Sequence, residues 1–343
     1  MVSSPLFAAA HSVEVPKLAI GMRSFESIFT GLRVFVRAVS ARLRGAQFRT
    51  RGQALIGGLL RAAIVQNIDI WREAKIRDLL FVNGVVVGAV VERNGKSVQI
   101  GAAKGVVLAS GGFARNAQLR KAHQAPVGID VTMAPSGDTG DAIAIATRVG
   151  ATTAFMEQSW WVPGTKTPNG PMLHVWDRCF PHSLIVDTRG ERYMDEAGPS
   201  MEVGQQMIER YRALGVDHSW LILESRHRRR YAFGMAPPMI TPREWFDSGY
   251  LLRADTVEAL AARMEIDPAA LIATLARFNT FVGAGEDLDF GRGSLPISRC
   301  EQPLPFPSVD DVERWAFAYL STRETSRDWI LLKCSGRLKW TTG

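Results

Sequence analysis

The stretch AKIRDLLFVNGVVVGAVVERNGKSVQIG, residues 74–101, contains two Asn-Gly dipeptides between runs of β-branched residues. A two-residue hairpin turn of type I′ needs positive φ angles at both central residues, and Asn-Gly is the dipeptide that adopts them most readily. Two such turns in succession predict a three-stranded antiparallel meander that turns at residues 83–84 and 94–95. A helix across this stretch would contradict the prediction.

The segments on either side of the meander predict an α/β fold. Residues 53–63 place apolar side chains on one face of a predicted helix, and residues 68–71 follow as a predicted short strand. After the meander, residues 105–110 form a continuous apolar run, which is typical of a strand buried on both faces. This run leads into Gly111 and Gly112, where the backbone can approach another group closely.

Length, composition and cysteine content bound the class of protein. The 343 residues suffice for two domains, and 46% hydrophobic with 22% charged residues excludes a wholly disordered chain. Three cysteines without CxxC spacing exclude a disulfide scaffold and a zinc ribbon, and they favour a reducing, cytoplasmic location. No apolar run reaches the roughly 18 residues of a membrane-spanning helix, so we expect no transmembrane segment.

Most of the net charge of +7 lies in the first 52 residues. Residues 29–44 place arginines beside an apolar stripe at helical spacing. We expect this helix to dock on its own domain with one face in solvent; the alternative is a helix that lies on a membrane surface. A dense cation run at 226–231 has one adjacent aromatic residue, Tyr231, so we expect no nucleic-acid partner.

Several further motifs are weak when each is taken alone. The loop SGDTGDA at 136–142 offers backbone N–H groups and two carboxylates at a predicted helix start, and either Thr139 or Asp141 is placed to cap that helix. Adjacent Trp160 and Trp161 point to opposite sides of an extended chain, so one of them is available to line a pocket or an interface. We find no HExxH, GxSxG or Walker A motif, and we predict no metal site.

Taken in order along the chain, these motifs resemble those of one enzyme family. The ordered set comprises GVVLASGGF at 105–113, SGDTGDA at 136–142, WWVP at 160–163, GERYMDE at 190–196, RRY at 229–231, RFN at 277–279 and DFGRG at 289–293. Over about residues 50–293 the chain resembles the FAD-dependent fumarate reductase/3-ketosteroid Δ1-dehydrogenase family. The Trp-Trp pair and the DFGRG element favour the steroid dehydrogenase branch.

The resemblance implies an α/β flavoprotein with a Rossmann-like FAD-binding domain, present in part, and an inserted α+β substrate domain that closes over the flavin ring. It assigns residues 53–150 to the FAD-binding domain and 151–293 to the substrate domain, with atypical segments at 1–52 and 294–343. The positions that match the family's cofactor contacts are Ile76, Ser110, Gly111, Gly112, Thr139, Gly140 and Asp141.

The resemblance also implies a chemistry. Enzymes of the steroid branch form a C1–C2 double bond beside a 3-keto group, which needs a base for the C2 proton, donors to the carbonyl, and N5 of FAD as hydride acceptor. Tyr231 matches a catalytic tyrosine, and Trp160 and Trp161 match the substrate side. Glu196 ends the stretch that supplies a substrate-binding carboxylate in fumarate reductases. The implied substrate is a small apolar steroid; the electron acceptor is left open.

The sequence departs from the family pattern near both ends. It contains no GxGxxG loop, which in the family meets the FAD pyrophosphate, and residues 299–343 do not resemble the family's glycine-rich closing segment. We therefore expect a chain truncated at both ends, derived from an enzyme for 3-ketosteroid 1,2-dehydrogenation. Two alternatives stay open: a fumarate-reductase-like enoate reductase, and a non-catalytic remnant that binds a partner through its basic N-terminus.

Overall fold

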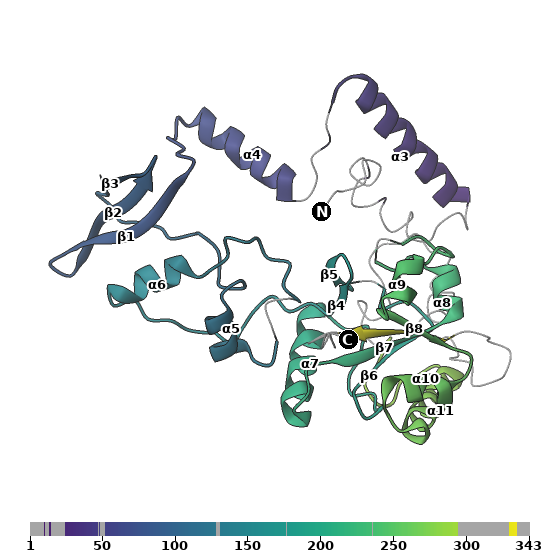
Figure 1. Ribbon diagram of the computed structural model, residues 1–343. Coiled ribbons are helices and arrows are strands. Elements are labelled where there is room, and N and C mark those ends of the chain that lie inside the picture. The colour runs from purple at the N-terminus through teal and green to yellow at the C-terminus, as the bar shows by residue number, and fades with distance from the viewer. Residues whose placement is uncertain are drawn as a thin grey trace. The chain divides into compact units, whose positions relative to one another are not determined.

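The computed structural model describes residues 10, 14, 25–46, 48, 52–127, 131–175, 177–234, 236–293 and 329–334 (Figure 1). These residues form two compact units. Unit 1 contains the described residues of 41–125 and 134–158. Unit 2 contains the described residues of 9–40, 126–133 and 159–334.

Unit 1 contains the meander that the two Asn-Gly dipeptides predict. Three antiparallel strands pair in sequence order, β1 (Ala74–Val82), β2 (Val85–Arg93) and β3 (Lys96–Gly101). Asn83 and Gly84 have φ angles of 48° and 81°, and Asn94 and Gly95 have 50° and 72°. All four angles are positive, as a type I′ turn requires, so the prediction is confirmed.

The described part of unit 1 also contains helices α4 (Gly52–Val65), α5 (Ala117–Gln124) and α6 (Asp141–Arg148). Helix α4 confirms the helix predicted at 53–63. Helix α6 confirms the helix predicted after the SGDTGDA loop, and Gly150 with a φ of 91° follows its C-terminus. Neither Thr139 nor Asp141 caps α6, because its N-cap is Gly140 and the Thr139 hydroxyl donates to the Asp141 carboxylate at 2.8 Å instead.

Two strands predicted for unit 1 do not form. Residues 68–71 and 105–110 pair with no strand in the described part of the chain, and Val107 is 90% exposed. A buried strand needs hydrogen-bonding neighbours and apolar cover on its faces, and an apolar composition supplies neither by itself. In unit 2, the GERYMDE stretch at 190–196 contains no strand.

Unit 2 is built around an antiparallel sheet with the strand order β6-β7-β9-β8. Its strands are β6 (Ser183–Val186), β7 (Ser219–Glu224), β8 (Leu251–Ala254) and β9 (Trp329–Cys334). Strand β7 confirms the strand predicted at 219–223, whereas β9 lies in a segment where the sequence shows no clear period. A separate hairpin joins β4 (Gly164–Thr167) to β5 (Gly170–Leu173).

Apolar side chains cover both faces of this sheet. The helices of unit 2 are α7 (Ser200–Leu214), α8 (Ser225–Arg230), α9 (Arg243–Asp247), α10 (Val257–Met264) and α11 (Pro268–Ala284). Because side chains alternate along a strand, β7 sends Trp220 and Ile222 to the core made with α10 and α11. It sends Leu221 and Leu223 to the core made with α7.

The N-terminal helix α3 (Phe25–Leu43) forms where the sequence predicts a basic helix. Val34 is buried, and the Arg37 guanidinium pairs with the Glu14 carboxylate at 2.7 Å, while Phe25 and Phe29 are exposed. In the described part of the chain, no helix has the length and apolar character needed to cross a membrane.

Candidate functional site

The two glycine-bearing loops of unit 1, residues 110–113 and 138–141, lie side by side. The Gly140 N–H donates to the Gly112 carbonyl at 2.9 Å, and the Arg115 N–H donates to the Asp138 carbonyl at 2.9 Å. The structure thereby brings together six of the seven predicted cofactor residues, namely Ser110, Gly111, Gly112, Thr139, Gly140 and Asp141.

The close approach of these loops depends on glycine at two positions. Gly111 has a φ of +91°, and a Cβ atom there would lie 2.2 Å from the Asp138 Oδ1 atom. Gly140 has a φ of +80°, and a Cβ atom there would lie 3.0 Å from the side chains of Phe113 and Leu119. Side chains are therefore excluded from both positions, while the backbone of residues 110–112 stays exposed to a ligand.

The seventh predicted residue, Ile76, lies on strand β1. This strand contacts the second glycine loop through an ion pair. Lys75, its neighbour on β1, places its Nζ atom 3.1 Å from the Asp141 carboxylate. The hydrogen bond from Thr139 and then the nearby Lys75 ammonium hold the pKa of Asp141 below its ordinary value. Asp141 is thus an acceptor-only carboxylate beside the backbone of the glycine loops, which suits contacts with ligand hydroxyl or N–H groups.

Tyr231, the candidate base, follows α8 in unit 2 and is buried. Its ring stacks on Phe180 with centroids 4.7 Å apart and an interplanar angle of 12°. Its N–H donates to the His227 carbonyl at 2.8 Å, and its carbonyl accepts from the Arg228 Nη1 group at 2.6 Å. The backbone of Tyr231 is therefore fixed on both sides.

The arginines before Tyr231 separate into two kinds. Arg229 and Arg230 are exposed, as expected for a cation run that faces solvent. Arg228 is buried and donates to the carbonyls of Tyr231, Pro237 and Ile240. Burial lowers the pKa of its guanidinium to about 10. Two of the three arginines at 228–230 therefore face solvent, and Arg228 instead supports the backbone around Tyr231.

The paired tryptophans point to different environments, as predicted. Trp160 is 90% exposed. Trp161 packs on α7 at Gly204, where an added Cβ atom would lie 2.5 Å from the Trp161 Cβ atom. Trp160 is therefore the residue of the pair that is available to a substrate or a partner. The substrate role of the two tryptophans stays a prediction.

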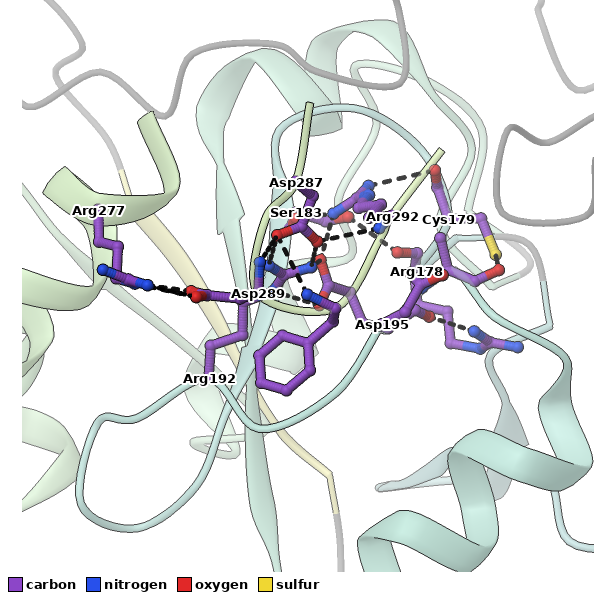
Figure 2. A network of polar contacts seen from close by, with 12 residues as sticks. Arg178, Cys179, Ser183, Arg192, Asp195, Arg277, Asp287, Asp289 and Arg292 are labelled. Atoms are coloured by element: carbon purple, nitrogen blue, oxygen red, sulfur yellow. Dashed lines mark hydrogen bonds and ion pairs between the residues drawn. The ribbon is translucent and has the colours of Figure 1, made fainter. Parts of the chain in front are cut away.

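Glu196, the predicted substrate-binding carboxylate, lies in a buried ion cluster. Figure 2 shows Arg192, Asp287 and Arg292 of this cluster. The Arg192 Nε group lies 2.9 Å from one Glu196 oxygen, and Arg292 contacts the other. Arg192 also pairs with Asp287 at 2.7 Å. The substrate role of Glu196 stays a prediction, and it would require one of these arginines to release an oxygen.

The ion cluster joins two motifs that the sequence shows only as separate patterns. Arg192 and Glu196 belong to GERYMDE, whereas Arg292 belongs to DFGRG, almost one hundred residues later. Beside them, burial and the Glu196 charge raise the pKa of Asp195 to about 6. Ion pairing over such a separation has no local sequence signal, so the cluster was not foreseen.

A second polar group in unit 2 was also missed. Asp177, His174, Thr165 and Tyr250 form a chain of hydrogen bonds and are all buried. The only local signal is the His-x-x-Asp spacing of residues 174 and 177, which is common in proteins. Among the described residues no cluster of His, Cys, Asp and Glu side chains is arranged to hold a metal ion.

Comparison with known proteins defines the class. The family described as FAD binding domain matches residues 29–320, so the chain belongs to it. A 3-oxosteroid 1-dehydrogenase of Mycobacterium tuberculosis is 33% identical over 288 residues, which are 79% of this chain and 50% of the relative. A 4-oxocyclohex-2-ene-1-carboxylate 5-dehydrogenase of Sinomonas cyclohexanicum is 32% identical over 272 residues, 74% of this chain and 45% of the relative.

A solved structure gives the same result. The crystal structure of 3-ketosteroid delta1-dehydrogenase from Sterolibacterium denitrificans, in complex with 1,4-androstadiene-3,17-dione, superposes with a TM-score of 0.81 at 25% identity. The match covers 94% of this chain and 59% of that chain. The resemblance to the FAD-dependent fumarate reductase/3-ketosteroid Δ1-dehydrogenase family is therefore confirmed, with FAD as the family's cofactor. The chain spans about half the length of the curated relatives it matches.

Proposed function

We propose that this chain carries part of the flavin site and the substrate side of an oxidoreductase that removes hydrogen from C1 and C2 of a 3-ketosteroid. The observation that carries the proposal is the 33% identity over 288 residues with a 3-oxosteroid 1-dehydrogenase. In this proposal residues 53–150 belong to a Rossmann-like FAD-binding domain, and residues 151–293 form the substrate domain that closes over the flavin.

The glycine loops of unit 1 fit one part of FAD. Gly111 and Gly140 exclude side chains, so a flat cofactor can approach the exposed backbone of residues 110–112. The Asp141 carboxylate offers an acceptor, and β1 offers its backbone at Ile76 for the adenine. When bound, FAD supplies a hydride acceptor at N5 of its ring.

The proposed base is the phenolate oxygen of deprotonated Tyr231, which receives the C2 proton of the substrate and becomes the neutral hydroxyl. A base that removes a carbon-bound proton must be held within hydrogen-bond reach of that proton. The stacking of Tyr231 on Phe180 and the two hydrogen bonds to its backbone hold its ring in one orientation. The surrounding aromatic rings exclude water, which strengthens the electrostatic interactions of the reacting groups.

A second candidate substrate class is a small cyclic ketone that carries a carboxylate. It is favoured by the 32% identity with 4-oxocyclohex-2-ene-1-carboxylate 5-dehydrogenase. Recognition of a carboxylate needs a cation with free N–H groups. The buried Arg192 and Arg292 are paired with Glu196 and Asp287, and the buried Arg178 and Arg228 donate to backbone carbonyls. We therefore rank the apolar steroid first. The same argument ranks the enoate reductase, whose substrates also carry carboxylates, below it.

Ligand binding to the purified chain tests the substrate class without relying on turnover. We expect 1,4-androstadiene-3,17-dione to quench tryptophan fluorescence saturably, and 4-oxocyclohex-2-ene-1-carboxylate and fumarate to have no effect. Saturable binding of a carboxylate but not the steroid would overturn the steroid proposal. Binding of none of the three would favour a non-catalytic remnant.

Turnover is tested in a chimaera in which residues 29–293 replace the matching region of the Mycobacterium tuberculosis relative. We expect Tyr231→Phe to lower steroid 1,2-dehydrogenation by at least about 100-fold, the low end for an acid–base group, with unchanged flavin content. The matched control is Tyr211→Phe, since Tyr211 is equally buried in unit 2. Equal activity of the two variants would remove Tyr231 from the proposed mechanism.

A further inference from the structure

Asp177 lies between two buried histidines and bonds to both. Its carboxylate Oδ2 atom lies 3.0 Å from the His174 Nδ1 atom, and its backbone carbonyl lies 2.9 Å from the His227 Nε2 atom. The same Oδ2 atom accepts the Gly234 N–H at 2.6 Å. All three side chains are less than a tenth exposed, so water does not replace these bonds.

The chemistry of Asp177 fixes the tautomers of both rings. A carboxylate and a carbonyl oxygen can only accept, so His174 carries its hydrogen on Nδ1 and His227 on Nε2. One oxygen of the Asp177 carboxylate accepts both the His174 Nδ1 hydrogen and the Gly234 N–H. Burial lowers the pKa of His227 to about 3 and keeps that ring neutral. The two histidines that bond to Asp177 therefore carry their hydrogens on different ring nitrogens, Nδ1 in His174 and Nε2 in His227.

The His174 tautomer gives direction to a longer chain of hydrogen bonds. In a neutral ring with its hydrogen on Nδ1, Nε2 accepts from the Thr165 hydroxyl, which lies 2.7 Å away. The Thr165 oxygen then accepts from the Tyr250 hydroxyl at 2.6 Å. The bonds therefore run from Tyr250 through Thr165 and His174 to the Asp177 carboxylate.

Asp177 also holds both ends of the segment that carries Tyr231. His227 lies four residues before Tyr231, and Gly234 lies three residues after it. Gly234 has a φ of +55°, a conformation that glycine adopts readily and that accompanies its short hydrogen bond to Asp177. With both flanks attached to one residue, the Tyr231 ring has little freedom to leave Phe180.

We propose that Asp177 is a positioning residue for Tyr231, and that its carboxylate orients the His174–Thr165–Tyr250 relay. The catalytic meaning of this role rests on the proposed function, because Tyr231 acts as the base only there. The tautomers and the attachment of residues 227–234 are properties of the chain itself.

Nitrogen-15 NMR of histidine-labelled chain tests the direction of the relay. We expect His174 to carry a hydrogen on Nδ1 and His227 to be neutral with its hydrogen on Nε2. Asp177→Ala removes the acceptor of the Nδ1 hydrogen, so that hydrogen should move to Nε2, where it can face the Thr165 hydroxyl, while His227 keeps its tautomer. Asp177→Asn should keep the His174 tautomer, because the amide oxygen can still accept from both His174 and the Gly234 N–H. The control is Asp187→Asn, a buried aspartate that bonds Arg210 and the Arg189 N–H and contacts neither histidine. An unchanged His174 tautomer in Asp177→Ala would overturn the proposal.

Amide hydrogen exchange tests the attachment of the Tyr231 segment. Losing one charge-assisted hydrogen bond should speed exchange at Gly234 by about 10- to 100-fold in Asp177→Ala. Thr165→Val interrupts the relay on its far side and should leave Gly234 exchange unchanged. If Asp177→Ala does not fold, His227→Leu and His227→Gln replace it. Leucine removes the donor to Asp177 and should speed exchange at Tyr231, whereas glutamine should restore protection. Equal exchange in the leucine and glutamine variants would then contradict the role.

The chimaera separates this inference from the proposed function. There we expect Asp177→Ala to lower kcat for steroid dehydrogenation at least tenfold with KM changed less than threefold, and Asp187→Asn to change neither. If the chimaera binds no steroid while the NMR and exchange results hold, the proposed function fails and the positioning of Tyr231 stands. If steroid turns over normally in a folded Asp177→Ala variant, the positioning role fails and the proposed function stands.

Discussion

The sheet of unit 2 and the helix α4 of unit 1 are both rich in apolar residues, but their surroundings differ. Strand β7 buries all six of its residues. Helix α4 buries none, and Leu55, Ile56 and Ile64 are each more than 60% exposed. Apolar burial is the main favourable contribution to folding. It therefore stabilises the sheet of unit 2 far more than it stabilises helix α4. Unit 2 has its own apolar core. In unit 1, which carries the candidate flavin loops, no residue of α4 is buried by the described part of the chain.

The largest effect that we expect concerns the affinity of unit 1 for FAD. The chain has no GxGxxG loop, so the FAD pyrophosphate lacks the N–H donors and helix N-terminus that usually bind it. Each charge-assisted hydrogen bond is worth about 1.5–3 kcal/mol, and losing three weakens binding by roughly three to six powers of ten at about 1.4 kcal/mol per tenfold.

We therefore expect the 343-residue chain to bind FAD poorly and to show no measurable dehydrogenase activity by itself. Flavin content after purification and titration calorimetry with added FAD measure this, with the Mycobacterium tuberculosis relative as the positive control. Stoichiometric FAD that co-purifies with a soluble monomer of this chain would contradict the expectation, and it would mean that unit 1 holds the cofactor without the loop.

The next effect tests the ion cluster that stabilises unit 2. Arg292→Ala leaves Glu196 buried beside a single guanidinium, and removal of one partner of a buried pair costs about 3–5 kcal/mol. The matched control is Arg277→Ala, since Arg277 pairs with Asp289 at 2.5 Å but its side chain is 64% exposed. That loss is about 0–1 kcal/mol. Urea unfolding followed by near-ultraviolet circular dichroism measures both, and equal losses would show that the buried cluster contributes no more than a surface pair.

A pair of apolar truncations compares the two regions directly. Ile222 is fully buried between β7 and the helices α10 and α11, so Ile222→Ala should cost about 2–5 kcal/mol. Leu59 on α4 is 58% exposed, and Leu59→Ala should change stability by less than about 0.5 kcal/mol. Chemical denaturation of the purified chain measures both. A large loss for Leu59→Ala would mean that α4 is covered in solution, and the contrast between the units would then be wrong.

Local patterns predicted local structure well. The Asn-Gly turns, the helix α4 and the helix after the SGDTGDA loop need only neighbouring residues, and all three form. The strand predicted at 105–110 fails because pairing depends on distant residues, and its composition alone does not supply a partner.

The candidate site likewise contains residues that local sequence predicts and contacts that it does not. The glycine loops could be recognised because glycine at positions such as 111 and 140 has a local reason, a positive φ. The resemblance to a family then selected the residues around them. The Arg292–Glu196 pair and the bond between Asp177 and Gly234 join residues that are far apart in sequence, and no periodicity encodes such contacts. Ion pairs and hydrogen bonds of this kind become visible only when the chain is folded.

The smallest expected effect concerns the pKa of Asp195, which lies beside the ion cluster. Burial and the neighbouring Glu196 charge raise the pKa of Asp195 from 3.8 to about 6. A raised carboxyl pKa means that the folded state binds the proton more tightly than the unfolded state does. The contribution of Asp195 to stability is therefore fully present below about pH 4, and it is lost as the pH rises through about 6. Above that pH the folded chain carries an unfavourable charge at this position.

Asp195→Asn should therefore stabilise the chain at neutral pH. The amide oxygen can still accept the Ala197 N–H, which donates to Asp195 at 2.9 Å. At about 1.4 kcal/mol for each pKa unit, and after a reduction for partial exposure, the gain is about 1–2 kcal/mol at pH 7.5 and close to zero at pH 4. Urea midpoints at the two pH values measure it, with the exposed Asp247→Asn as a control that should change little at either. An equal gain at both pH values would show that the amide stabilises the cluster by packing, and that Asp195 carries no charge penalty in the folded chain.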